Sequence, residues 1–112
     1  MKIKVSEATN IQLDWLVAKA LPAPANTLEL LDRDIYNGFS PTTNWAQGGP
    51  IIEREDISPR SCGDGSWVAD WYFGDVRRVG PTPLIAAMRC YVASKLGDEV
   101  DIPAELVQSN PI

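Results

Sequence analysis

The chain has 112 residues, of which 45% are hydrophobic and 22% charged, and its net charge is -5 at pH 7. This length and balance predict one globular domain over residues 1–112 with its own hydrophobic core. The negative charge disfavours binding to nucleic-acid phosphates and to anionic membranes. The sequence has no histidine, which excludes Ser-His-Asp triads, Cys-His nucleophiles and His-ligated zinc within one chain.

The N-terminal region predicts a strand followed by a capped helix. Residues 1–5 alternate between apolar and lysine positions, as a half-buried strand does. Thr9 and Gln12 have the spacing of a capping box, so a helix is expected from Asn10 to about Leu21. Asp14 and Lys19 are expected to face solvent. The apolar stripe contains Leu13, Leu16, Val17, Ala20 and Leu21, widened by Ile11, Trp15 and Ala18.

Two segments of the first half allow alternatives. Residues 27–38 suit a strand or a short helix equally well. In residues 43–56, Gly48-Gly49-Pro50 interrupts a helical pattern, because proline lacks the donor that a helix interior needs. One alternative is a turn followed by a short helix over 50–56. The other is a single kinked helix from Thr43.

The second half predicts further strands around a long helix. Residues 58–66 read as a loop, 67–73 as an aromatic strand, 74–81 as a connection and 98–102 as a final short strand. Within 67–73, the side chains expected on one face are Trp67, Ala69, Trp71 and Phe73.

The long helix is marked at both ends. Thr82 supplies a cap and Pro83 suits the first helical position, while Lys95 lies in the last turn and Gly97 supplies the stop. The helix is apolar nearly all round, so it must be covered on more than one side. The expected fold is therefore α+β, a small sheet of few strands covered by two or three helices in a layered α/β sandwich.

Two stretches carry a family resemblance. Residues 45–55 (Trp-Ala-Gln-Gly-Gly-Pro-Ile-Ile-Glu-Arg-Glu) and 82–100, together with the opening strand and helix, resemble the NinX-like family of small bacteriophage and prophage proteins. The resemblance implies a phage or prophage origin and the cytoplasm of the bacterial host, and it implies no defined activity. The first stretch also resembles a helix of phage alpha-beta-alpha sandwich domains, which favours the kinked-helix alternative.

The segment 45–53 is the candidate binding surface, because it joins a large aromatic side chain to a flexible glycine pair. Glycine pairs let a backbone approach a ligand or partner closely. An anion site at Gly48-Gly49-Pro50 is the sharper hypothesis, and a structural turn or tight helix packing is the commoner one. The candidate binding residues are Trp45, Gln47, Gly48, Gly49, Pro50 and Glu53.

Three other constellations have a functional and a structural interpretation. Six acidic residues are either ligands of magnesium in a nuclease-like site or a solvated charge run, and the charge run is the commoner outcome; they are Glu53, Glu55, Asp56, Asp64, Asp70 and Asp75. Trp45, Trp67 and Trp71 form either a stacking platform or part of the core, and core packing is the commoner outcome. Arg89 is either a surface residue or the partner of an internal carboxylate such as Asp70.

Two classes of function remain. The first is a non-catalytic accessory protein that binds a host or phage protein, or a second copy of itself, without a cofactor. The second is a small metal-dependent enzyme or nucleotide binder in phage nucleic-acid metabolism. No apolar run of membrane-spanning length and no signal-peptide core are present, so the cytoplasm is the expected location. Cys62 and Cys90 are expected to be reduced there, with Cys90 as a small core residue.

Overall fold

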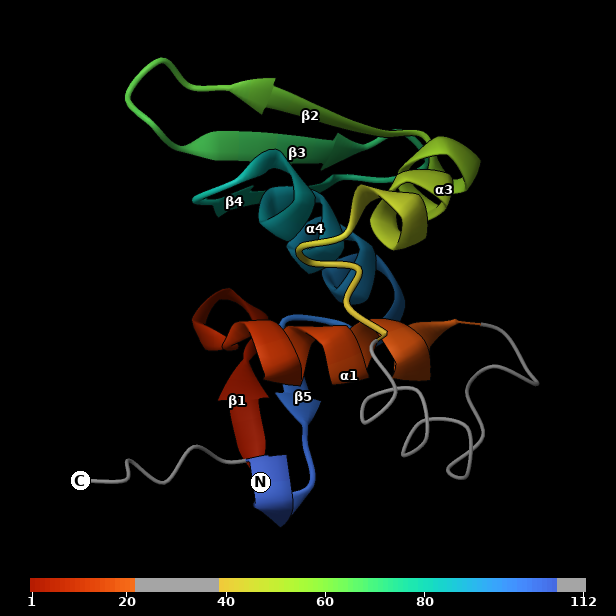
Figure 1. Cartoon of the computed structure of the whole chain (residues 1–112), viewed down its shortest axis with the longest axis vertical. Helices are drawn as coiled ribbons and strands as arrows, with labels where there is room; N and C mark the ends of the chain where they lie inside the picture. The colour runs from red at the N-terminus through yellow and green to blue at the C-terminus, as the bar shows by residue number, and fades with distance from the viewer. Residues whose placement is uncertain (22–38, 107–112) are drawn as a thin grey trace.

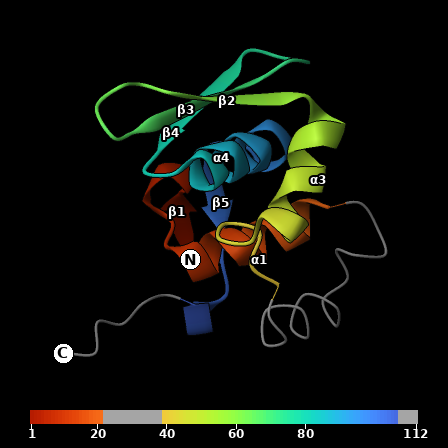
Figure 2. The same ribbon diagram turned by 45° about the horizontal axis from the view of Figure 1, so that its top comes forward.

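The computed structural model describes residues 1–21 and 39–106, and a long helix, α4, lies at their centre (Figure 1). One side of α4 packs on a three-stranded antiparallel sheet of order β2-β3-β4, and α1 crosses its other side. Helix α3 runs along the flank of α4 (Figure 2). Strands β1 and β5 pair in a second antiparallel sheet. The elements are β1 (Lys2–Lys4), a 3-10 turn η1 (Val5–Glu7), α1 (Asn10–Ala20), α3 (Trp45–Glu55), β2 (Ile57–Ser61), β3 (Trp67–Trp71), β4 (Val76–Gly80), α4 (Pro83–Leu96), β5 (Glu99–Asp101) and η2 (Ala104–Leu106).

Both predicted helix caps are confirmed. The Thr9 hydroxyl accepts a hydrogen bond from the Gln12 amide at 3.3 Å, and Gln12 Oε1 accepts one from the Thr9 amide at 3.0 Å. The Thr82 hydroxyl likewise accepts from the Ile85 amide at 3.1 Å. Helix α4 stops at Gly97, whose φ of 91° is accessible to glycine at little cost. These local signals therefore set the starts of α1 and α4 and the end of α4.

The core lies between the inner face of the three-stranded sheet, α4 and α1. Met88, Val92 and Cys90 of α4 have no exposed surface, and neither has Ala69 of β3. The Tyr91 hydroxyl is positioned to donate to the Ala20 carbonyl at 3.3 Å and so ties α4 to the end of α1. The other fully covered side chains of the α1 face are Leu13, Leu16, Val17 and Ala18. The expectation that α4 is covered on more than one side is confirmed.

The predicted loop and connection around the aromatic strand are partly wrong. The first half of residues 58–66 belongs to β2, which accepts Pro59 because it is an edge strand of the sheet. Most of residues 74–81 form β4. Its two consecutive arginines, Arg77 and Arg78, interrupt the alternation of apolar and polar residues that predicts a strand. Strand β3 ends at Trp71, so Phe73 lies in the turn beyond it and is 59% exposed.

Two side chains of α1 also differ from expectation. Asp14 is only 6% exposed, because its carboxyl binds the backbone of the segment that leads into α3. Ile11, expected in the apolar stripe, is 59% exposed at the first turn of the helix. The helical period places residues on a face, but it cannot tell how far a neighbouring segment covers that face.

The α+β class is confirmed, and the strands divide between two antiparallel sheets rather than one. The final strand predicted over 98–102 is confirmed as β5, which pairs with β1 through Ile3 and Val100. The ambiguous segment 27–38 lies outside the described residues. Within the described part of the chain, none of the helices is both long enough and apolar enough to cross a membrane.

Candidate functional site

The candidate segment is one continuous helix, α3, rather than a turn followed by a short helix. Its N-terminus is capped by Asn44, whose Oδ1 accepts a hydrogen bond from the Ala46 amide at 2.9 Å. Pro50 lies inside the helix on its exposed side. Because proline has no N–H to donate, the carbonyl of Ala46, four residues earlier, receives no helical hydrogen bond from it, and Ala46 is itself exposed to water. Asp56 ends the helix in the left-handed conformation, with φ 52°. Of the two alternatives for residues 43–56, the single helix is correct, and it begins at Trp45.

The helix divides the six candidate residues between two faces. Trp45, Pro50 and Glu53 are exposed, and the half-buried Gly49 lies beneath the Trp45 ring, where a Cβ on Gly49 would be 3.9 Å from Cε3 of the indole. We call these four residues the outer strip of α3. Trp45 is 54% exposed, which is unusual for so large an apolar side chain.

The other two candidates face inward and hold α3 in place. Gln47 Oε1 accepts a hydrogen bond from the Ser40 amide at 2.5 Å. Gly48 is buried, and a Cβ at this position would lie 2.5 Å from the Pro41 carbonyl oxygen and 2.7 Å from Cδ2 of Leu84. Gly48 thus allows α3 to approach α4 and the preceding segment closely, which supports the packing interpretation of this glycine.

A hollow of about 300 Å³ lies beside Trp45, where the first turns of α1, α3 and α4 meet. We call it the Trp45 pocket. Its lining is mainly apolar, with threonine hydroxyls and one side-chain amide. The lining residues are Asn10, Thr42, Thr43, Trp45, Thr82, Pro83, Leu84 and Ile85.

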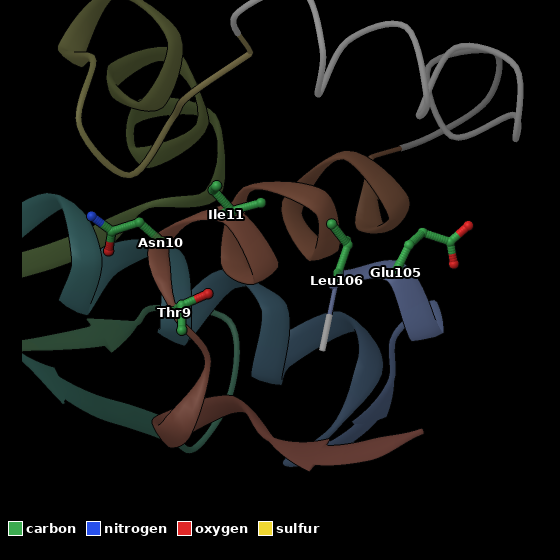
Figure 3. A pocket seen from close by; sticks show the side chains of 5 residues that line it. All are labelled: Thr9, Asn10, Ile11, Glu105 and Leu106. Carbon is green, nitrogen blue, oxygen red and sulfur yellow. The ribbon is translucent and has the colours of Figure 1, made fainter. Parts of the chain in front are cut away.

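A second hollow, of about 390 Å³, adjoins the first through Asn10 and is shown in Figure 3. We call it the Ile11 pocket. Its side chains come from the start of α1 and from η2, which is tied to α1 by a hydrogen bond from Gln12 Nε2 to the Leu106 carbonyl at 2.7 Å. Unlike the Trp45 pocket it has a charged lining residue, Glu105. The full lining is Thr9, Asn10, Ile11, Glu105 and Leu106.

The structure separates the three tryptophans of the predicted platform. Trp67 and Trp71 are half-buried on β3 and pack against the core, as the core interpretation predicts. Trp45 is largely exposed at the start of α3. The Tyr72 and Phe73 rings, which the sequence reading did not single out as a surface, form an exposed edge-to-face pair in the β3–β4 turn, with centroids 5.2 Å apart.

Three of the six acidic residues proposed as magnesium ligands, Glu55, Asp64 and Asp70, are engaged with basic side chains or a hydroxyl group. Glu55 pairs with Lys95 at 3.1 Å, and Asp70 pairs with Arg60 at 2.8 Å and Arg77 at 2.6 Å. The two arginines lower the pKa of Asp70. Among the described residues, no three acidic or cysteine side chains are grouped closely enough to hold a metal ion.

Arg89 has a different partner from the one expected. It is half-buried and donates a hydrogen bond from Nη1 to the Val79 carbonyl at 2.9 Å, so it binds the edge of β4 and not Asp70. Burial lowers the pKa of its guanidinium. Both cysteines are free thiols, with Cys62 exposed and Cys90 buried.

The sequence indicated Trp45 but not the pocket beside it. Thr82 and Pro83 were recognised as helix-start residues, and Asn10 as the first residue of α1. Their meeting with Thr42 and Thr43 is a tertiary feature. A sequence pattern indicates where a helix begins, but it does not indicate that the first turns of three helices lie next to one another in the fold.

Comparison with known proteins identifies the family. Residues 4–95 match the family model described as bacteriophage P22, NinX, and this range runs from the last residue of β1 through almost the whole of α4. No curated protein matches the chain. The match includes both stretches that carry the resemblance, the α3 segment and most of the α4 segment. Because it covers more than half of the chain, this protein belongs to the bacteriophage P22 NinX family.

Proposed function

We propose that this chain is a phage accessory protein without catalytic activity, and that it binds another protein of phage or host origin in the host cytoplasm. The proposed contact surface is the outer strip of α3 together with the Trp45 pocket. The observation that carries the proposal is the exposed indole of Trp45, which stands at the rim of a mainly apolar hollow. Tryptophan beside such a hollow is typical of the few residues that dominate protein interfaces.

The remaining features of the surface agree with this role. Glu53 extends the strip by two helical turns from Trp45 and offers a charge at its far end. The backbone of α3 is held by the hydrogen bond between Gln47 and Ser40 and by the close approach of Gly48 to Pro41. Little conformational entropy is therefore lost when a partner binds. An enzyme would instead need a gathered set of reacting groups.

The test compares two exposed aromatic residues. Immobilised wild-type protein, Trp45→Ala and Phe73→Ala are used to capture proteins from phage-infected and uninfected host lysate, and a captured protein is then purified and titrated. Phe73 is the matched control because it is as exposed as Trp45 but lies in the β3–β4 turn. We expect Trp45→Ala to weaken the purified complex by about tenfold or more, and Phe73→Ala to leave it unchanged.

The competing functions give different results. Saturable thermal stabilisation by a nucleotide with magnesium or manganese, unaffected by Trp45→Ala, would favour the small metal-dependent enzyme or nucleotide binder. A dimer in light scattering that dissociates in Trp45→Ala would assign the surface to a second copy of the chain. Equal affinity of wild type, Trp45→Ala and Glu53→Ala for the captured partner would refute the proposed surface.

A further inference from the structure

We propose that the Trp45 pocket receives a single uncharged, apolar side chain from the partner protein. This inference rests on the proposed function and specifies the chemistry of the same surface. It is argued from the shape of the pocket, from the charges around it and from the bonds that fix its walls.

The pocket is large enough for one such side chain. Its volume is about 300 Å³, and its apolar lining includes Trp45 of α3 and the α4 residues Pro83 and Leu84. Leu84 is buried, so the base of the pocket is continuous with the contact between α3 and α4. Two exposed threonines of the lining, Thr43 and Thr82, are suited to the backbone of the segment that carries the inserted side chain, whereas Thr42 is buried.

The distribution of charge selects against an ionised side chain. Among the described residues that line this pocket, none is acidic or basic. Asp14 lies next to the lining residue Thr42, but its carboxyl already accepts a hydrogen bond from the Thr42 amide at 2.9 Å, and burial raises its pKa. An ionised group inserted here would lose water without gaining a partner, which is costly.

The surrounding helices add to this selection. The pocket lies at the N-terminal turns of α1, α3 and α4, and the positive ends of their dipoles disfavour a lysine or arginine side chain. Each of these turns already uses a side-chain acceptor of its own, from Thr9, Asn44 or Thr82. The same helix ends would favour a carboxylate only modestly, and among the described residues no base lines the pocket, so an acidic side chain would gain no ion pair there. The Ile11 pocket differs in this respect, since it contains Glu105.

The walls are held before any partner arrives. Thr42 is fixed by Asp14 and the start of α4 by the Thr82 cap, while Gly48 brings α3 against Leu84. A preformed pocket requires little ordering on binding, so even a small apolar molecule should show measurable affinity.

The test uses four amino-acid amides as probes of side-chain chemistry. Nα-acetyl-leucinamide and Nα-acetyl-tryptophanamide are neutral and apolar, and Nα-acetyl-lysinamide and Nα-acetyl-glutamic acid amide are their charged controls. Each is titrated into the full chain and followed by two-dimensional amide NMR. We expect saturable shifts at Thr43, Trp45 and Leu84 with the apolar probes, and binding about tenfold weaker with the charged probes.

Variants connect the shifts to the pocket. Trp45→Ala should abolish them, Thr43→Trp should block the pocket from its exposed rim, and Phe73→Ala should bind like the parent. Two substitutions at different positions keep the test valid if one of them fails to fold.

Several results would overturn the inference. They are equal binding of the charged probes, shifts that map to Tyr72 and Phe73, unchanged binding by both pocket variants, or concentration-dependent shifts at the pocket without any probe, which would assign it to a second copy. If the probes fail while a purified partner still depends on Trp45, the pocket chemistry is refuted and the proposed function stands. If the probes bind as expected and partner binding is independent of Trp45, the proposed function fails on its own test.

Discussion

Asp14 of α1 accepts a hydrogen bond from the backbone amide of Thr42 at 2.9 Å, across 28 residues of sequence. Both residues are buried. The bond fixes the segment before α3 against α1 and thereby sets the base of the Trp45 pocket. Burial raises the pKa of the Asp14 carboxyl, and the hydrogen bonds from Thr42 lower it by a smaller amount.

This relationship predicts opposite effects for two substitutions of Asp14. Asp14→Ala leaves the buried Thr42 amide without an acceptor and should reduce the free energy of unfolding by about 1–3 kcal/mol. Asp14→Asn keeps an acceptor and removes the buried charge, so at pH 7 it should be at least as stable as the parent. Denaturant unfolding of the three proteins measures this.

The raised pKa of Asp14 also fixes the sign of the pH dependence. The folded state binds the Asp14 proton more tightly than the unfolded state, whose value is near 3.8, so this contribution to stability is complete below that pH. It is lost as the pH rises through the higher folded-state pKa. The advantage of Asp14→Asn should therefore shrink when unfolding is measured at progressively lower pH towards 3.8, and a constant difference between pH 7 and pH 4 would contradict this account.

The starts of α1 and α4 were predictable because each is specified within four residues. Thr9 and Gln12 satisfy one another, and Thr82 followed by Pro83 suits only the start of a helix. Asp14 could not be placed from the same pattern, because its environment depends on Thr42, which is distant in sequence. Strand β4 was not predicted for a similar reason. Its residue Arg77 forms an ion pair with Asp70 on the neighbouring strand β3, and that partner cannot be read from the sequence around Arg77.

The candidate site was predictable only as a segment. Its aromatic residue and its glycine pair were visible in the sequence, but their division between two faces depended on whether Gly48 and Pro50 interrupt the helix. The close approach of Gly48 to Pro41 and Leu84 decides that question, and it is a tertiary contact. The pocket beside Trp45 requires three helix starts to meet, which no local pattern encodes.

The contribution of the Thr82 hydroxyl to the cap of α4 can be measured with two substitutions. Thr82→Ala removes the acceptor of the Ile85 amide and should cost about 1 kcal/mol of stability. Thr82→Ser keeps the hydroxyl and should remain close to the parent, because serine caps helices as well as threonine does. Chemical denaturation midpoints distinguish them, and equal losses in both variants would show that the threonine methyl group matters instead of the cap.

The two cysteines should differ sharply in reactivity. Cys62 is exposed in the β2–β3 turn, whereas Cys90 is buried and burial raises the pKa of its thiol to about 11. Because the thiolate is the reactive form, iodoacetamide at pH 8 should label the native protein once, at Cys62. Mass spectrometry should find two labels after unfolding without reductant. A single mass two hydrogens lighter than the reduced protein, with no label after unfolding, would instead indicate a disulfide.

Adjacent glycines of α3 should respond in opposite ways to the same substitution. Gly48→Ala places a Cβ 2.5 Å from the Pro41 carbonyl oxygen, a backbone atom that cannot easily move, and should cost about 1–3 kcal/mol. Gly49→Ala places its Cβ 3.9 Å from the Trp45 ring, which is ordinary van der Waals contact. Since alanine favours a helix over glycine, this variant should be unchanged or more stable by about 0.5–1 kcal/mol.

Thermal and denaturant unfolding of the two variants measure the difference, and the amide NMR spectrum shows whether the start of α3 has moved. If Gly48→Ala is as stable as Gly49→Ala, then α3 does not pack against Pro41 and Leu84 as described, and the walls of the Trp45 pocket are not fixed. If only Gly48→Ala is destabilised and its shifts spread to Thr42 and Leu84, the glycine is part of the scaffold that supports the outer strip. Gly48 then acts by keeping Trp45 and Glu53, the contact residues of the proposed surface, in position.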